Sequence, residues 1–134
     1  MSGYRVFRRD EMELTPPSRG DQRRCVLRLS PALSTSRANI WSMPAGSRGR
    51  RHRETVQEEL FVALEGNMTL LLGDPPETVV VPAGSVVVVP VGTPLQLVNE
   101  GTADSLVLIV GAPPVANGGE YLPDIPAPDS PGAC

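Results

Sequence analysis

Short runs of alternating apolar and polar side chains follow one another through the middle of the chain. Turn-forming clusters of Pro, Gly, Asn and Asp separate these runs about every 8–12 residues, and no long window has the 3.6-residue period of a helix. This spacing predicts an all-β fold, either a sandwich or a barrel. The predicted strands cover residues 24–29, 39–43, 60–64, 68–72, 78–81, 85–89, 95–98 and 106–110.

The two ends of the chain differ from this middle part. Residues 1–23 hold one weak strand, Tyr4 to Phe7, followed by a Pro-Pro loop that ends at Gly20. Residues 111–134 contain six prolines and no apolar period, so we expect a tail that is draped over the domain or partly disordered. The predicted organisation is one domain, with a barrel over residues 24–110. Removal of residues 126–134 should cost less than about 1 kcal/mol.

The run Val86 to Val89 is apolar on both faces of its predicted strand. One face of a barrel strand meets the interior, so the other face must be covered by a second sheet or by another subunit. We therefore expect a homodimer that buries on the order of 1,600 Å².

Length and composition narrow the class of protein. The 134 residues are 40% hydrophobic, enough for one buried core. No segment approaches about 18 consecutive apolar residues, and the N-terminus lacks the apolar core of a secretory signal, so we predict a cytoplasmic protein without a membrane partner. The two cysteines, Cys25 and Cys134, are predicted to be free thiols.

The charges are distributed unevenly along the chain. All 12 basic residues are arginines at or before Arg53, so residues 1–53 carry a balance of +8 and residues 54–134 a balance of −11. Such asymmetry can mark an arm that binds nucleic acid. Here the arginines alternate with apolar residues, as in Arg24, Val26 and Arg28, which is typical of a solvated strand face. We predict no nucleic-acid partner.

The candidate chemistry lies between Gly46 and Gly66. This segment holds His52, the only histidine, with three carboxylates within seven residues of it, and then becomes an apolar run from Leu60 to Leu64. A polar loop that leads into a buried strand is a common way for a rigid sheet to present chemistry to a cavity. The segment is therefore predicted to hold an active or binding pocket.

Two stretches of the chain resemble the two motifs of the cupin superfamily. The first motif is Gly, five residues, His-x-His, three or four residues, Glu, six residues and Gly, and it is matched at Gly46, His52, Glu59 and Gly66. The second is Pro-x-Gly, two residues, His, three residues and Asn, and it is matched at Pro90, Gly92 and Asn99. The resemblance spans about residues 24–110 and implies a double-stranded β-helix of the jelly-roll type.

The resemblance also implies a metal site that is incomplete in this chain. Cupins that bind a metal use His, His and Glu from the first motif and His from the second, at positions occupied here by His52, Glu54, Glu59 and Leu95. A leucine cannot ligate, so we expect no cofactor. A divalent Mn, Fe or Zn ion held by His52, Glu54 and Glu59 remains the alternative. Two carboxylates about 4 Å apart repel by roughly 4 kcal/mol at an effective dielectric of 20, so a metal, a proton or a neighbouring cation must offset this.

Without a metal, His52 and Glu59 form a candidate acid/base couple, with Glu54 as a further catalytic candidate. A nearby carboxylate raises the pKa of a histidine, and such a pair can move a proton in an isomerisation, cyclisation, dehydration or decarboxylation. We predict that a small organic molecule binds in an apolar barrel pocket and reacts by metal-independent isomerase, cyclase or lyase chemistry. The alternatives are a metal-dependent, dioxygenase-like cupin and a ligand-binding module without turnover. The expected pocket residues are Trp41, Met43, Gln57, Phe61, Leu95 and Leu97.

Overall fold

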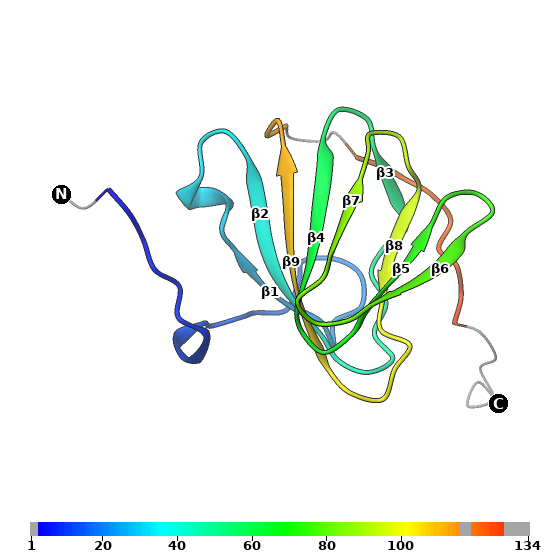
Figure 1. The fold of residues 1–134 in the computed structure, drawn as a ribbon, viewed down its shortest axis with the longest axis horizontal. Helices are drawn as coiled ribbons and strands as arrows, with labels where there is room; N and C mark the ends of the chain where they lie inside the picture. Colours follow the sequence, from blue (N-terminus) through cyan, green and yellow to red (C-terminus); the bar gives the residue numbers. More distant parts are fainter. Residues whose placement is uncertain (1–2, 116–118, 128–134) are drawn as a thin grey trace.

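Two five-stranded antiparallel sheets make up the body of the computed structural model, which describes residues 3–115 and 119–127 (Figure 1). The first sheet has the strand order β1 (Cys25–Arg28), β2 (Arg37–Met43), β9 (Ser105–Ala112), β4 (Glu58–Glu65) and β7 (Val86–Val89). The second has the order β10 (Gly119–Tyr121), β3 (His52–Glu54), β8 (Leu95–Val98), β5 (Met68–Leu72) and β6 (Glu77–Val81). The only described helices are two 3-10 turns, η1 (Arg9–Glu11) and η2 (Ser30–Ala32), and neither could cross a membrane. The predicted all-β, double-stranded β-helix is confirmed.

Each of the eight predicted strand runs corresponds to an observed strand, and two further strands were not predicted. β3 consists of three polar or charged residues and has no alternation to detect, while β10 begins at a glycine within the proline-rich tail. Both become strands through pairing: β10 pairs with β3, and Tyr121 lies opposite His52.

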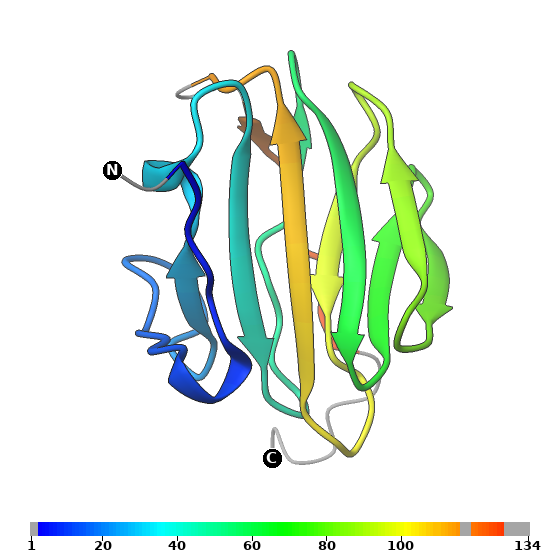
Figure 2. The same cartoon turned by 60° about the vertical axis from the view of Figure 1, so that its left-hand side comes forward.

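The N-terminal strand prediction is wrong. Tyr4 to Phe7 belong to no strand, and η1 is the only regular element in the described residues before Thr15. The segment lies along the outside of the first sheet (Figure 2), where Arg9 contacts Glu65 at 2.7 Å between Nε and Oε2. Ladder hydrogen bonds need a free sheet edge, and this segment pairs with none. Cys25 is a free thiol among the described residues, and Cys134 lies outside them, so the prediction of two free thiols stays a prediction.

The interior-facing residues of β2, β9 and β4 change from apolar to polar along the barrel. Strand pairing aligns them in three rows: Trp41, Val107 and Ala63; then Asn39, Ile109 and Phe61; then Arg37, Gly111 and Glu59. The hydrophobic core of the barrel includes residues of the first two rows and residues beyond them: Met43, Phe61, Ala63, Met68, Leu70, Val81, Val89, Leu95, Leu97 and Val107. Alternation with period two therefore builds the core at one end of these strands and a polar interior at the other.

The described part of the tail packs on the second sheet as well as adding β10 to it. The backbone N–H of Ile125 donates to Oε1 of the fully buried Gln96 at 2.8 Å, and the N–H of Arg51 donates to Asp124 Oδ1 at 2.8 Å. Arg48 Nη2 donates to the carbonyl of Ile125 at 2.7 Å. The tail is thus draped over the domain as far as it is described, and residues 128–134 lie outside the described residues.

These contacts predict different costs for two truncations. Deletion of residues 119–134 removes β10 and leaves the buried Gln96 oxygen without its donor, so the free energy of unfolding should fall by more than about 2 kcal/mol. Deletion of residues 126–134 keeps Ile125 and serves as the matched control, with an expected cost below about 1 kcal/mol. Urea denaturation of the two truncated proteins measures both values. Equal costs would show that the segment 119–125 does not stabilise the sheet.

The outer face of β4 and β7 exposes a patch of apolar side chains. Leu60 lies opposite Val88, and Val62 lies opposite Val86. Val86 and Val88 are 53% and 63% exposed, although both belong to a β-sheet. No described segment of the chain covers this face, which is the second face of the two-sided apolar run noted in the sequence.

We propose that a second copy of the chain covers this outer face. Light scattering should then give twice the monomer mass of 14.3 kDa at micromolar concentration. Val88→Glu places a charge in the patch and should shift the protein to the monomer. Val56→Glu changes a half-exposed valine of the β3–β4 turn and should leave the mass unchanged. A monomeric mass for the unmodified protein would contradict the proposal.

Candidate functional site

His52, Glu54 and Glu59 converge in the barrel. β3 carries His52 and Glu54 on one face, and the interior-facing Glu59 comes from β4 in the other sheet. His52 Nε2 lies 3.2 Å from Glu54 Oε2 and 3.8 Å from Glu59 Oε1, and one ligand-type atom from each of the three residues lies within 4.8 Å of the other two. The structure therefore brings together the three residues that the sequence singled out.

The hydrogen bonds of His52 determine where its protons sit. Nδ1 lies 3.2 Å from the carbonyl oxygen of Arg50, and because a carbonyl can only accept, Nδ1 carries a hydrogen. A neutral ring would then turn the lone pair of Nε2 toward the oxygens of Glu54 and Glu59, which is unfavourable. Nε2 must therefore hold either a second proton or a cation.

The two carboxylates favour the charged form of the imidazole. Burial alone would lower the pKa of His52, but the hydrogen bond to Glu54 and the neighbouring Glu59 carboxylate outweigh it and raise the pKa to about 10. At neutral pH and without a metal, His52 is an imidazolium that offsets the repulsion between Glu54 and Glu59.

The same three residues fit a metal ion with an incomplete ligand set. Nε2 of His52 and the oxygens of Glu54 and Glu59 form a one-nitrogen, two-carboxylate group, and the bond from Nδ1 to Arg50 is the second-shell contact that orients a ligating histidine. Glu59 Oε1 is buried without a hydrogen-bond partner among the described residues. Leu95 is opposite His52 in the β3–β8 register and buried, so the fourth position of the cupin set has no donor.

Two cavities of about 450 and 240 Å³ lie beside this cluster. Both are lined by Arg19, Trp41, His52, Glu59, Ile109 and Tyr121, so they are two lobes of one cavity. We call the larger one the amide lobe, after Asn39 and Gln57, and the smaller one the arginine lobe, after Arg24, Arg28 and Arg50. The combined size is in the range of pockets that hold a small organic ligand.

Five of the six residues expected in the pocket line this cavity. Trp41 lines both lobes, Gln57 lines the amide lobe, and Phe61, Leu95 and Leu97 line the arginine lobe. Met43 does not: it shares the parity of Trp41 but lies further along β2, fully buried in the core cluster. The expectation of a mostly apolar pocket also needs correction, since arginines, amides and carboxylates line much of the wall. The polar ends of β2 and β4 face inward at the open part of the barrel.

Gln57 offers an unused donor to the amide lobe. Its side chain is 5% exposed, and Nε2 has no hydrogen-bond partner among the described residues. Gly111 makes room for it, because a Cβ at that position would lie 2.8 Å from Gln57 Oε1. A buried amide N–H without a partner is costly, so Gln57 is suited to donate to a ligand.

Sequence reasoning missed the arginines and the tyrosine of the wall. Tyr121, from the tail strand β10, packs edge-on against the His52 ring at 6.2 Å, and the Arg50 guanidinium lies 3.7 Å from the Tyr121 ring centroid. Strand pairing across about 70 residues of sequence makes this contact, so no local pattern indicates it. The signal that could have found the arginines is the concentration of all positive charge before residue 54.

With this geometry in hand, the family can be assigned. The sequence profile of the cupin domain matches residues 39–111, more than half of the chain. The protein belongs to the cupin family. The matched range contains both motifs, together with β4, which carries Glu59, and the β7 strand that pairs with it. No curated protein matches the sequence.

Solved structures share the fold at low identity. A sugar phosphate isomerase of the cupin superfamily from Silicibacter pomeroyi is 22% identical with a TM-score of 0.69, and the match covers 88% of this chain and 92% of that chain. The polyketide cyclase RemF from Streptomyces resistomycificus is 18% identical with a TM-score of 0.71, covering 90% and 82%. A structure from Acidithiobacillus ferrooxidans is 22% identical with a TM-score of 0.59, covering 66% of this cupin and only 58% of that chain.

The pKa of His52 predicts how stability depends on pH. Because the folded-state pKa is raised above about 6.5, the stabilisation should be fully present below pH 6.5 and lost as the pH rises toward 10. NMR titration of this single histidine, with a chelator present, should show its midpoint well above 6.5. Denaturation of His52→Gln between pH 6 and 10 should lack the pH-dependent loss seen in the unmodified protein. A midpoint near 6.5 would show that the carboxylates do not stabilise the imidazolium.

Proposed function

We propose that this cupin binds a small organic molecule in the two-lobed cavity and moves a proton on it without a metal ion, in an isomerase, cyclase or lyase type of reaction. The observation that carries the proposal is the position of His52 Nε2, which lies against two carboxylates in the cavity wall while Nδ1 is fixed by Arg50. This arrangement holds a charged acid and a carboxylate base side by side.

The contacts suggest different roles for the two carboxylates. Glu54 is within hydrogen-bond distance of Nε2 and keeps the imidazole charged. Glu59 Oε1 is buried and has no hydrogen-bond partner among the described residues, so it is available as a base. Glu59 would take a proton from a carbon next to a carbonyl, and His52 would donate its Nε2 proton to the carbonyl oxygen. The product of this step is the neutral enol. Where the deprotonated carbon carries a hydroxyl group, Glu59 then returns its proton to the former carbonyl carbon and that hydroxyl gives its proton back to Nε2 of His52, which forms the new carbonyl and completes an isomerisation.

The rest of the cavity suits a partly apolar substrate. Trp41, Phe61 and Ile109 offer apolar surface for a carbon skeleton, and Gln57 Nε2 is placed to donate to a carbonyl or hydroxyl oxygen. The names of the two structural neighbours, a sugar phosphate isomerase and a polyketide cyclase, are in keeping with this class of chemistry. Their identity to this chain is low, so they support the fold, and the proposal depends on the site itself.

A metal-dependent reaction is the second candidate, favoured by the orphaned oxygen of Glu59 and the close approach of three ligand-type atoms. His52, Glu54 and Glu59 would hold a divalent ion. Such an ion supplies Lewis-acid chemistry when bound, and with a redox-active metal also chemistry on O2. His52 would then be neutral at Nε2, so the two candidates use different protonation states of the same ring.

Proton exchange with solvent tests the proposal. The test uses a panel of ketose phosphates and aryl ketones in D2O with a chelator present. We expect the protein to catalyse exchange of the hydrogen next to the carbonyl for deuterium in members of this panel, and proton NMR measures the loss of the signal. Glu59→Gln should slow the exchange by about 100-fold or more, the typical contribution of a general base. Glu58→Gln is the matched control, because this neighbouring side chain is exposed and lies outside the cavity, so its exchange rate should be unchanged.

The same samples separate the alternatives. Exchange that is lost with chelator and restored by Mn, Fe or Zn would identify the metal-dependent reaction. No exchange with or without metal, across the panel, would contradict catalysis of this kind and favour a ligand-binding module.

A further inference from the structure

The wall of the cavity carries more positive than negative charge, although the chain as a whole has a net charge of −3. Five arginines line the two lobes, whereas Glu54 and Glu59 are the only acids among the lining residues. The arginines are Arg19, Arg24, Arg28, Arg37 and Arg50. A cavity with an excess of positive charge in its wall attracts anions.

Arg24 is the most unusual of these side chains, because it is only 7% exposed and forms no ion pair in the described part of the chain. Its Nε donates to the carbonyl of Asp21 at 3.1 Å and its Nη2 to the carbonyl of Arg19 at 3.1 Å, both neutral acceptors. The guanidinium lies 4.6 Å from the Trp41 ring centroid, in the wall of the arginine lobe. Among the described residues, no carboxylate lies within ion-pair distance of it. Asp21 and Asp124 attract its charge only from further away, and burial lowers the pKa of Arg24, so a closer anion would stabilise the buried charge.

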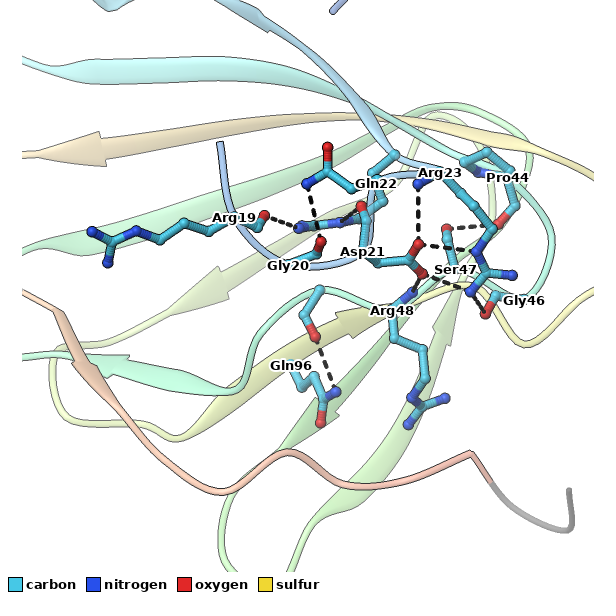
Figure 3. A network of polar contacts seen from close by, with 12 residues as sticks. Arg19, Gly20, Asp21, Gln22, Arg23, Pro44, Gly46, Ser47, Arg48 and Gln96 are labelled. Carbon is cyan, nitrogen blue, oxygen red and sulfur yellow. Dashed lines mark hydrogen bonds and ion pairs between the residues drawn. The ribbon is translucent and has the colours of Figure 1, made fainter. Parts of the chain in front are cut away.

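Two further guanidinium groups are held at the same lobe without a carboxylate partner in the described part of the chain. Arg50 is stacked on Tyr121, which fixes the plane of its guanidinium. Arg19 lines both lobes, and Figure 3 shows its side chain extending away from the polar network around Asp21. Three arginines therefore border one space.

The neighbouring carboxylate, Asp21, makes its ion pair and hydrogen bonds with Arg23 and Arg48 instead of with these groups. Asp21 Oδ2 accepts from Arg23 Nη2 at 2.6 Å and from the backbone N–H of Arg48 at 3.1 Å, which joins the loop before β1 to the loop after β2 (Figure 3). The hydrogen bond with Arg23 holds the pKa of Asp21 well below its usual range. The loop is thus fixed in place by one arginine while leaving Arg24 without a carboxylate.

The packing of this loop requires a glycine next to the arginines. Gly20 has φ +82°, and a Cβ there would lie 2.6 Å from Arg24 Nη2 and 3.4 Å from Arg50 Cγ. Only glycine combines this backbone conformation with such a close approach. The loop geometry therefore brings Arg24 and Arg50 together at the cavity wall.

We propose that the arginine lobe binds the carboxylate or phosphate group of a small organic anion, held by Arg24 and Arg50 with Arg19 at the junction of the lobes. Guanidinium groups pair with both kinds of oxyanion through two parallel N–H donors. The apolar part of the ligand lies against Trp41 and Phe61, and its far end reaches His52 and Glu59, which line the same lobe. The inference rests on the proposed function for what happens at that far end and adds the chemical class of the substrate.

The fluorescence of Trp41, the only tryptophan, reports binding because its ring lies in the cavity wall. The probes are two matched pairs, benzoate with benzamide and glucose 6-phosphate with glucose, with calorimetry as a second readout. At least one anion should bind saturably and at least tenfold more tightly than its neutral partner. Which anion binds distinguishes a planar carboxylate from a sugar phosphate as the ligand.

Substitutions locate the site. Arg24→Met and Arg50→Met should each weaken anion binding at least tenfold, whereas Arg8→Met, an exposed arginine far from the cavity lining, should not change it. Arg50 is only partly buried, so its variant keeps the test valid if Arg24→Met fails to fold. Equal affinity for anion and neutral partner, no saturable binding, or unchanged affinity in Arg50→Met would overturn the inference.

A third variant separates this inference from the proposed function. Glu59→Gln should slow proton exchange by about 100-fold or more, as above, and still bind the anion. If the unmodified protein binds the anion but catalyses no exchange, the anion site is supported and the proposed catalysis is contradicted. If it exchanges neutral ketones and shows no preference for anions, the proposed catalysis is supported and the anion site is contradicted.

Discussion

The contact between His52 and two carboxylates is the constraint on which the site depends. Oxygens of Glu54 and Glu59 that lie within 4.8 Å of each other repel by about 3–4 kcal/mol at an effective dielectric of 20. A proton or a metal at Nε2 offsets this cost, and in both cases the hydrogen bond from Nδ1 to the carbonyl of Arg50 orients the ring. Whether Nε2 of His52 holds a proton or a metal ion therefore decides between acid/base chemistry and metal chemistry at the same site.

The barrel supports this contact by dividing its interior along the strands. In β2, β9 and β4 the inward-facing residues are apolar at one end and polar at the other, so the core that stabilises the fold and the wall that binds a ligand belong to the same strands. A site on paired strands is held more rigidly than one on a free loop, which suits a reaction that needs a fixed acid and base. The small Gly111 between Arg37 and Glu59 leaves space where a side chain would fill the cavity.

The fold brings several arginines of the positively charged N-terminal part of the chain together at one cavity. The loop before β1 and the loop after β2 are joined through Asp21, and their arginines border one lobe beside the two glutamates of the site. Aromatic rings from distant strands, Trp41 and Tyr121, stack against two of these guanidinium groups and orient them. The arginines that alternate with apolar residues, a pattern typical of a solvated strand face, therefore in part line the cavity.

The fold class, eight of the strands and the cluster of His52, Glu54 and Glu59 follow from the amino-acid sequence alone. Period-two alternation and turn residues act locally, and the two cupin motifs have fixed spacings, so all of these can be found without coordinates. Three features depend on the three-dimensional fold: Met43 lies in the core while Trp41 lines the cavity, the polar residues of β3 form a strand, and Tyr121 from the tail packs against His52. The physical reason is that alternation along a strand tells which face of the sheet a residue lies on, but not how far along the barrel it lies. Pairing between distant segments depends on backbone hydrogen bonds that no local sequence pattern encodes.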